Sequence, residues 1–327
     1  MTKNYAGIDL GSNSCKIIIC DENKNALCIK NTSTRLAEGM YKNNRITDEA
    51  IERCQKCFYD YRQLLDEHNV DTENVRAITT AACRTAENGA DLVKLIYAES
   101  GIKLEIIDGK EEAELNLKGA VEHVLNKSEY VVVFDLGGAS TEVTLATNSK
   151  TPKIISTVSI PWGARNSSEA FNLVEYDEER ANMLRKEVDA YMDEFFDKVG
   201  CSQIDNAVFV ATSSTPLRLA SMINQFGQYD RDKADGVIME REDMDKAISS
   251  ILKAKRATLA KNPYIGDKRS YIFISAAVIF KQVYERLGVD KVTASLKSAK
   301  DGIVAELIER DKNNNIVTLW CKNGKAY

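Results

Sequence analysis

Two seven-residue segments of this chain nearly repeat each other, and they constrain its fold more than any other feature. Residues 8–14 read IDLGSNS and residues 134–140 read FDLGGAS, so an apolar residue, Asp-Leu-Gly and small polar residues recur 126 positions apart. Each segment ends one strand-like run and leads into another. A near-repeat at this distance indicates that a whole domain has been duplicated.

The order of the predicted elements also supports two domains. Three strands are predicted at 4–11, 14–22 and 25–36, and three more at 129–137, 141–147 and 152–160. Helices and further strands follow each set, and 327 residues suffice for two domains. We therefore predict an N-terminal domain at 1–126 and a C-terminal domain at 127–327, the latter with additional helices and a final strand after Lys312.

Composition narrows the class of protein. The net charge of −5 gives no general attraction to nucleic acid or to anionic membranes, and no apolar run reaches membrane-spanning length. The chain enters a strand at once without a signal-peptide core, so we expect a cytoplasmic location. Two histidines disfavour a Ser-His-Asp hydrolase. Cys54 and Cys57 form a single C-x-x-C inside a predicted helix, which favours core packing over a metal or redox site.

The chemistry of the paired segments points to phosphate. A strand that ends in D-x-G and turns sharply presents backbone N–H groups to an anion, while the Asp can hold a divalent cation. Two such turns that face each other across a cleft would bind phosphate and metal together. The alternative is two ordinary hairpin turns in which each Asp caps local N–H groups. That alternative would be preferred for one turn, but not for two turns that each open a domain-sized repeat.

The paired turns resemble the phosphate loops of the actin-like ATPase superfamily, which includes actin, Hsp70 and sugar kinases. Within it, IDLGSNS together with DLGGASTE resembles the exopolyphosphatase / guanosine pentaphosphate phosphohydrolase (Ppx/GppA) family, whose motifs read I-D-x-G-S-N-S-x-R and D-x-G-G-G-S-T-E. ITTAACRTAENG at 78–89 and EIIDGKEEAEL at 105–115 fit two further family motifs in order. The segments at 267–280 and 299–304 fit more loosely.

The resemblance implies an α/β fold of two duplicated actin-like (ribonuclease H-like) domains with a ligand cleft between them. It implies hydrolysis of a terminal phosphate from inorganic polyphosphate or from pppGpp, with Mg²⁺ or another divalent cation. The implied partners are therefore polyphosphate or guanosine penta- or tetraphosphate, and a homodimer is a further expectation. Phosphoryl transfer mainly needs positioning and charge neutralisation, and hydrolysis also needs a base for water. With so few histidines, a carboxylate is the available base.

The resemblance and the chemistry assign roles to individual residues. Glu112 matches the family's catalytic base, although an acid in a first helical turn can also simply complement the helix dipole. Glu142 is predicted to orient water or metal, and Asp9 and Asp135 to face the metal. Arg84 is expected to bind phosphate, with a surface salt bridge as the alternative. The predicted substrate-binding residues are Gly11, Ser12, Asn13, Ser14, Lys16, Arg84, Gly137, Gly138, Ala139, Ser140, Thr141 and Arg269.

Several positions depart from the family's pattern, and they fall on substrate-holding segments. They are Ala139 for a glycine, Lys16 for an arginine, Ser213 and Ser214 for glycines, Tyr271 for an aspartate, and Lys300-Asp301 for Arg-Glu. If the second turn needs a positive φ, Ala139 would be strained there. The departures keep a second hypothesis open, namely a low-turnover sensor that binds an alarmone or polyphosphate. An actin-like kinase is disfavoured, because Glu112 and the S-N-S and S-T-E details match the hydrolase branch.

Overall fold

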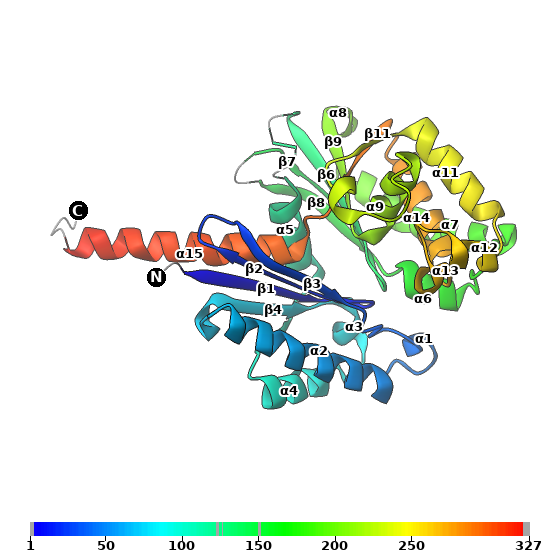
Figure 1. Cartoon of the computed structure of the whole chain (residues 1–327). Coiled ribbons are helices and arrows are strands. Elements are labelled where there is room, and N and C mark those ends of the chain that lie inside the picture. Colours follow the sequence, from blue (N-terminus) through cyan, green and yellow to red (C-terminus); the bar gives the residue numbers. More distant parts are fainter. Residues whose placement is uncertain (1–2, 122–123, 126, 150–151, 323–327) are drawn as a thin grey trace.

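The computed structural model describes residues 3–121, 124–125, 127–149 and 152–322, which form two α/β domains (Figure 1). The first domain is built on a five-stranded sheet of order β3-β2-β1-β4-β5. The second is built on a six-stranded sheet of order β10-β11-β9-β6-β7-β8. Within these described residues, no helix has the length and apolar content needed to cross a membrane.

The elements of the first part of the chain are β1 (Asn4–Leu10), β2 (Cys15–Asp21), β3 (Ala26–Thr32), α1 (Met40–Asn43), α2 (Asp48–Glu67), the 3₁₀ turn η1 (Thr72–Asn74), β4 (Val75–Thr79), α3 (Ala81–Thr85), α4 (Gly89–Ser100), β5 (Leu104–Ile106) and α5 (Gly109–Ala120). Those of the remainder are β6 (Tyr130–Leu136), β7 (Thr141–Thr147), β8 (Ile154–Ile160), α6 (Ala164–Ala170), α7 (Glu178–Phe196), α8 (Cys201–Asp205), β9 (Ala207–Thr212), α9 (Ser214–Ile223), α10 (Arg231–Ala234), β10 (Ile238–Glu240), α11 (Arg241–Lys253), α12 (Arg256–Lys261), α13 (Asp267–Ser270), α14 (Phe273–Arg286), β11 (Lys291–Ser295) and α15 (Ala299–Lys322).

The two sheets share one topology at their centres. β1 pairs antiparallel with β2 and parallel with β4, and β6 pairs in the same way with β7 and β9. β3 and β8 extend the two sheets beside β2 and β7, again antiparallel. The predicted duplicated α/β fold is therefore confirmed, and the turn between the first two strands of each domain lies at an equivalent place.

Local signals fixed several boundaries. Thr47 caps α2 by accepting from the backbone N–H of Ala50, and α4 ends at Gly101, whose φ of 69° lies in the left-handed region that glycine favours. Cys54 and Cys57 are free and buried in the first domain's core. β4 ends at Thr79, and the alanine-rich segment after it forms α3.

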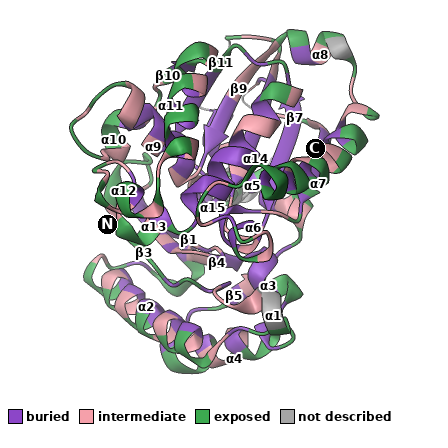
Figure 2. Ribbon diagram, turned by 90° about the vertical axis from the view of Figure 1, so that its right-hand side faces the viewer, coloured by how far each residue is buried: buried purple, intermediate pink, exposed green. Residues whose placement is uncertain are grey.

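Helix α5 and the first part of α15 (residues 299–308) lie between the two sheets, and Figure 2 shows buried residues of both at the centre of the molecule. Leu115 on α5 joins the cluster under the first sheet, whereas Leu117 and Ala120 pack against the second. The two helices approach each other closely: a Cβ at Gly302 would lie 2.1 Å from the carbonyl oxygen of Leu115. α5 therefore packs against both domains.

The end of the chain differs from the prediction. A final strand was expected after Lys312, but α15 continues as a helix to Lys322; residues 323–327 lie outside the described part. An apolar stripe that includes Ile303, Leu307 and Ile308 packs α15 on the first domain's sheet, although this segment was assigned to the second domain. Once packing nucleates a helix, extending it costs little, which overrides the strand preference of Ile, Val and Thr in the tail.

Candidate active site

The near-repeat segments form two matching turns, called here the first loop (residues 11–14) and the second loop (residues 137–140). A backbone hydrogen bond from the first to the fourth residue closes each loop, at 3.0 Å in the first and 2.9 Å in the second. The loops touch: a Cβ at Gly138 would lie 3.0 Å from Cβ of Ser12 and 3.3 Å from Cβ of Asn13. The close approach of the two domains therefore favours glycine at 138.

The loops line a cleft that is walled by both domains. Twelve predicted site residues line this cleft, namely Asp9, Gly11, Ser12, Asn13, Ser14, Lys16, Glu112, Asp135, Gly137, Gly138, Ser140 and Arg269. Four others, Arg84, Ala139, Thr141 and Glu142, do not contribute to its lining. The fold thus gathers into one cleft residues that are spread over most of the chain.

The second loop accepts alanine without strain. Ala139 is absent from the residues with positive φ, as are the loop glycines Gly11, Gly137 and Gly138. The methyl group of Ala139 packs against the core of the first domain. Strict space limits instead apply at Gly163, where a Cβ would lie 2.6 Å from the backbone nitrogen of Ala139. The condition for strain at Ala139 is therefore not met.

The strand register gives the two domains different charges at equivalent places. Asp9 lies opposite Lys16 in the β1–β2 pair, and their side chains form an ion pair of 3.7 Å. Asp135 lies opposite Glu142 in the β6–β7 pair. Like charges directly opposite each other in a sheet repel. The second domain therefore carries an acidic pair where the first carries a neutralised one.

Glu112 sits in the first turn of α5, whose N-cap Asp108 accepts from the backbone N–H of Glu111 at 2.8 Å. Glu112 is only 8% exposed, and its Oε2 has no hydrogen-bond partner among the described residues. The guanidinium of Arg84 lies 3.8 Å from that oxygen. Burial, followed by the charge of Glu142, raises the pKa of Glu112 well above its ordinary value.

Glu142 is buried behind the cleft wall and accepts a hydrogen bond from Oγ of Ser159 at 3.1 Å. Burial, followed by the charge of Asp135, raises the pKa of Glu142 from 4.5 to about 7. Burial also raises the pKa of Asp9, against the opposing charge of Lys16. The acids thus form a site in which adding positive charge or protons is favourable.

This acidic site suits a divalent cation that keeps part of its water shell. Among the described residues, no three His, Cys, Asp or Glu side chains gather closely enough to hold a metal ion by themselves. Mg²⁺ is commonly bound through one or two carboxylates together with substrate phosphates. Asp9 and Asp135, one beside each loop, offer that donor set, and the free buried oxygen of Glu112 adds a further acceptor.

Three predicted binding residues differ in whether their polar groups already form hydrogen bonds within the protein. Arg84 uses Nη1 to donate to the carbonyl of Ile107 at 2.7 Å. The hydroxyl of Thr141 donates to the carbonyl of Trp162 at 2.8 Å, away from the cleft lining. Arg269 lines the cleft without an ion pair among the described residues; burial, then the charge of Arg218, lowers its pKa to about 10.

The second-domain wall carries two of the departures. Ser213 and Ser214 line the cleft at the start of α9, and Ser213 adopts φ 86° and ψ −178°, a conformation that favours glycine. The Ser213 hydroxyl oxygen is buried without a partner among the described residues. Tyr271, in contrast, is exposed outside the cleft lining, with the guanidinium of Arg256 4.6 Å from its ring centre.

Sequence reasoning treated Lys300 only as a departure, but the structure places it in the cleft. Its side chain is 4% exposed, and Nζ donates to Oδ2 of Asp301 at 2.5 Å and to the carbonyl of Leu296 at 3.1 Å. Its charge favours the ionised form of Asp9. Gly163 and Ser159 were also missed, because neither the close backbone approach at Gly163 nor the contact from Ser159 to Glu142 leaves a local pattern.

The chain is similar to known proteins over most of its length. A model of the Ppx/GppA phosphatase family matches residues 19–311, a range that begins just after the first loop. The bifunctional 3-dehydroquinate synthase/phosphatase of Fusobacterium nucleatum is 27% identical over 93% of this chain and 46% of that protein. The guanosine-5'-triphosphate,3'-diphosphate pyrophosphatase of Photobacterium profundum is 25% identical over 95% of this chain and 61% of that protein. The chain thus spans about half the length of these relatives.

Solved structures match over nearly their whole length. The crystal structure of an exopolyphosphatase-like protein has a TM-score of 0.86 and 26% identity, and the match covers 94% of this chain and 99% of that one. An exopolyphosphatase from Cytophaga hutchinsonii has a TM-score of 0.83 and 22% identity over 94% of this chain and 98% of that one. The second of these likenesses concerns the fold alone.

Proposed function

This chain belongs to the Ppx/GppA phosphatase family, and we propose that it is a metal-dependent phosphohydrolase that removes the terminal phosphate from inorganic polyphosphate or from pppGpp. The observation that carries the proposal is Glu112, a buried carboxylate in the cleft with one oxygen left without a hydrogen bond. Such an oxygen is available to accept the proton of an attacking water.

The two loops hold the terminal phosphate in this proposal. The backbone N–H groups that do not close the loops, together with the hydroxyl of Ser12, would contact the anion, and the charges of Lys16 and Arg269 would balance it. Two loops in direct contact fix the phosphorus atom relative to Glu112, which is the main requirement of phosphoryl transfer.

Water activation falls to Glu112, which accepts the proton of the water. Glu142, held by Ser159 and buried behind the cleft lining, acts on Glu112 through its charge. Asp9 and Asp135 would hold Mg²⁺ or another divalent cation. When bound, that cation would neutralise phosphate oxygens, and its charge would lower the pKa of both glutamates.

The direct test is phosphate release. Purified protein with Mg²⁺ is incubated with long-chain polyphosphate or with pppGpp, and orthophosphate is measured. We expect release from at least one of them. Loss of a general base typically lowers the rate about 10²–10⁴-fold, so Glu112→Gln should lower turnover by that factor while the affinity for tripolyphosphate stays near the original value. Glu114→Gln, an exposed carboxylate on the same helix, is the matched control.

A sensor remains the second candidate, because Ser213 lines the second-domain wall in a strained conformation and places a side chain where the family has glycine. Tight binding of polyphosphate or an alarmone by calorimetry, with release from neither substrate, would favour the sensor over the enzyme. Normal turnover in Glu112→Gln would instead show that another group acts as the base.

A further inference from the structure

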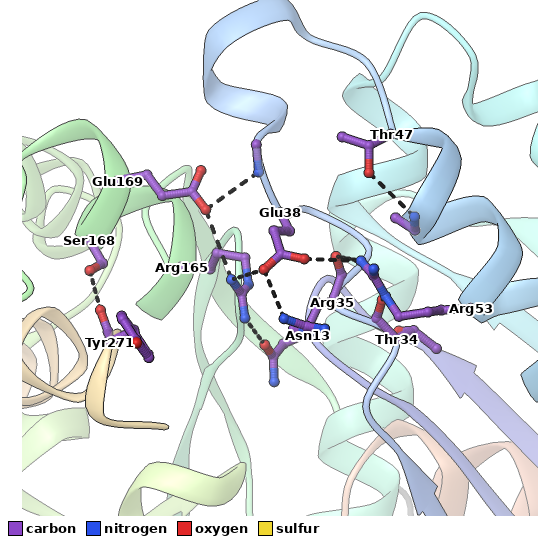
Figure 3. Close-up of polar contacts among 12 residues, drawn as sticks. Asn13, Thr34, Arg35, Glu38, Thr47, Arg53, Arg165, Ser168, Glu169 and Tyr271 are labelled. Atoms are coloured by element: carbon purple, nitrogen blue, oxygen red, sulfur yellow. Dashed lines mark hydrogen bonds and ion pairs between the residues drawn. The ribbon is translucent and has the colours of Figure 1, made fainter. Parts of the chain in front are cut away.

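Charged side chains reach from the second domain to the first beside Asn13 of the first loop (Figure 3). Arg165 lies at the start of α6, and its Nη2 donates to Oδ1 of Asn13 in the first loop at 2.5 Å. Its Nη1 lies 3.9 Å from Oε1 of Glu38. Farther along α6, Glu169 accepts from the backbone N–H of Gly39 at 3.5 Å. α6 thus contacts both the first loop and the segment 34–39.

The segment 34–39 is itself attached to the first loop. The backbone N–H groups of Arg35 and Ala37 donate to carbonyls of the first loop at 3.0 and 2.8 Å. Glu38 in the same segment forms ion pairs with Arg35 and with Arg53 of α2, both at 3.1 Å. A displacement of Glu38 would therefore move the backbone of the first loop.

The start of α6 is attached to the second loop in the same manner. The backbone N–H groups of Ala164 and Arg165 donate to the carbonyls of Gly137 and Gly138 at 2.9 and 2.7 Å. The side chain of Asn166 donates to the carbonyl of Ala139 at 2.8 Å. The backbone of Arg165 is therefore bonded to the second loop, while its side chain contacts the first. The position of this side chain consequently depends on how the two loops lie relative to each other.

The contact with Asn13 also determines which end of that amide faces a ligand. An Asn side chain offers one acceptor oxygen and an NH₂ group with two donors. Arg165 occupies the oxygen, and Figure 3 shows the amide nitrogen of Asn13 pointing away from Arg165. Asn13 lines the cleft, so the group left for a ligand there is a donor, which suits a phosphate oxygen.

Stability of the fold does not account for this arginine. The Arg165 side chain is only 8% exposed, and its Nε has no hydrogen-bond partner among the described residues. Burial, the largest effect, lowers the pKa of Arg165 against the charges of Glu38 and Glu169. The cost of burying a guanidinium largely offsets its ion pairs, so these pairs are weak evidence for a stabilising role; Glu38 and Glu169 are 38% and 30% exposed, so water can solvate their carboxylates without Arg165.

We propose that Arg165 is a positioning residue that acts across the cleft: it turns the NH₂ group of Asn13 toward a bound phosphate and, through Glu38, holds the two loops together. The inference rests on the proposed function only for the nature of the ligand, a phosphate chain. It assigns to a residue of the second domain a role in positioning the first loop.

The test compares Arg165→Met with the full-length wild-type chain by two readouts that need no turnover. Calorimetry measures the affinity for tripolyphosphate with Mg²⁺, and mass spectrometry measures amide hydrogen exchange in 35–39. Loss of a charge-assisted hydrogen bond that orients a ligand group typically weakens binding about tenfold or more. We expect that loss together with faster exchange in 35–39, while the thermal midpoint stays near that of the wild type.

Two further variants make the result specific. Arg185→Met removes an arginine that pairs with Glu178 at 3.1 Å within the second domain, and it should change neither readout. Glu38→Gln removes the ion pairs with Arg165, Arg35 and Arg53 but keeps the contact between Arg165 and Asn13, so exchange in 35–39 should rise with a smaller loss of affinity. Unchanged exchange in Glu38→Gln would overturn the link through Glu38, also if Arg165→Met does not fold.

The outcomes separate this inference from the proposed function. An Arg165→Met protein that binds tripolyphosphate within twofold of the wild type and exchanges at the same rate in 35–39 would overturn the inference. Equal effects in Arg185→Met would also overturn it, because a general charge effect would then suffice. A wild-type protein that binds tripolyphosphate but releases no phosphate from polyphosphate or pppGpp would overturn the hydrolase proposal alone.

Discussion

The acidic pair of Asp135 and Glu142 should lower the unfolding free energy of the protein above neutral pH. Burial and the neighbouring carboxylate raise the pKa of Glu142 from 4.5 to about 7. The folded protein therefore binds this proton more tightly than the unfolded chain does. Stability from this group is fully present below pH 4.5 and is lost as the pH rises through 7.

The size of the effect follows from the two pKa values. A pKa difference of one corresponds to about 1.4 kcal/mol, so the change from 4.5 to about 7 is worth about 3 kcal/mol of unfolding free energy. Glu142→Gln has no such proton to lose, and its amide oxygen can still accept from Ser159. We expect the variant to match the wild type near pH 4.5 and to be more stable by about 3 kcal/mol at pH 8.

The assay is urea unfolding of both proteins from pH 4.5 to 8 with a chelator present, so that no divalent cation occupies the site. Glu114→Gln serves as control, since its carboxylate is half exposed, and it should show no comparable trend. A stability difference that is constant with pH, or a Glu142→Gln protein less stable at pH 8, would refute the reasoning. Either result would show that another interaction reduces the repulsion between Asp135 and Glu142.

Three other substitutions test single contacts. Ser213→Gly should raise the unfolding free energy by about 1 kcal/mol in denaturant titrations, because the relief of strain at φ 86° exceeds the entropy cost of glycine. Gly302→Ala should lower the unfolding free energy by about 2 kcal/mol or more, since its Cβ would lie 2.1 Å from the Leu115 carbonyl oxygen; an unchanged midpoint would mean that α5 and α15 are less tightly packed. Gly138→Ala should reduce phosphate release about tenfold with little loss of stability, because its Cβ would press on Ser12 at 3.0 Å and separate the loops; full activity would argue against contact between them.

Much of the fold could be predicted because its signals are local. Apolar runs bounded by turns marked β1, β2, β6 and β7, and the Asp-Leu-Gly segments marked the equivalent turn in each domain. The last helix could not be predicted this way. Its tail favours a strand by composition, whereas contacts of Ile303 and Leu307 with the first sheet, which are distant in sequence, set its conformation.

The candidate site divides in the same way. The residue types of the two loops and of Glu112 were readable from motifs, because phosphate and water chemistry restrict which side chains can serve. Residues that act through neighbours were not readable. Arg165 contacts Asn13 across 152 positions, and Lys300 reaches the cleft from the start of the last helix. Neither contact leaves a spacing or a composition to detect.

The sequence by itself determined the repeated turn, the acids beside it and the glycines that keep it compact, since these depend on backbone geometry within a few residues. Only the tertiary structure decided that Ala139 is unstrained, that Glu112 keeps a buried oxygen without a hydrogen bond, and that Arg165 joins the two loops. The physical reason is that burial, pKa and contact between domains depend on what packs around a residue, and that packing involves segments more than a hundred residues apart in the chain.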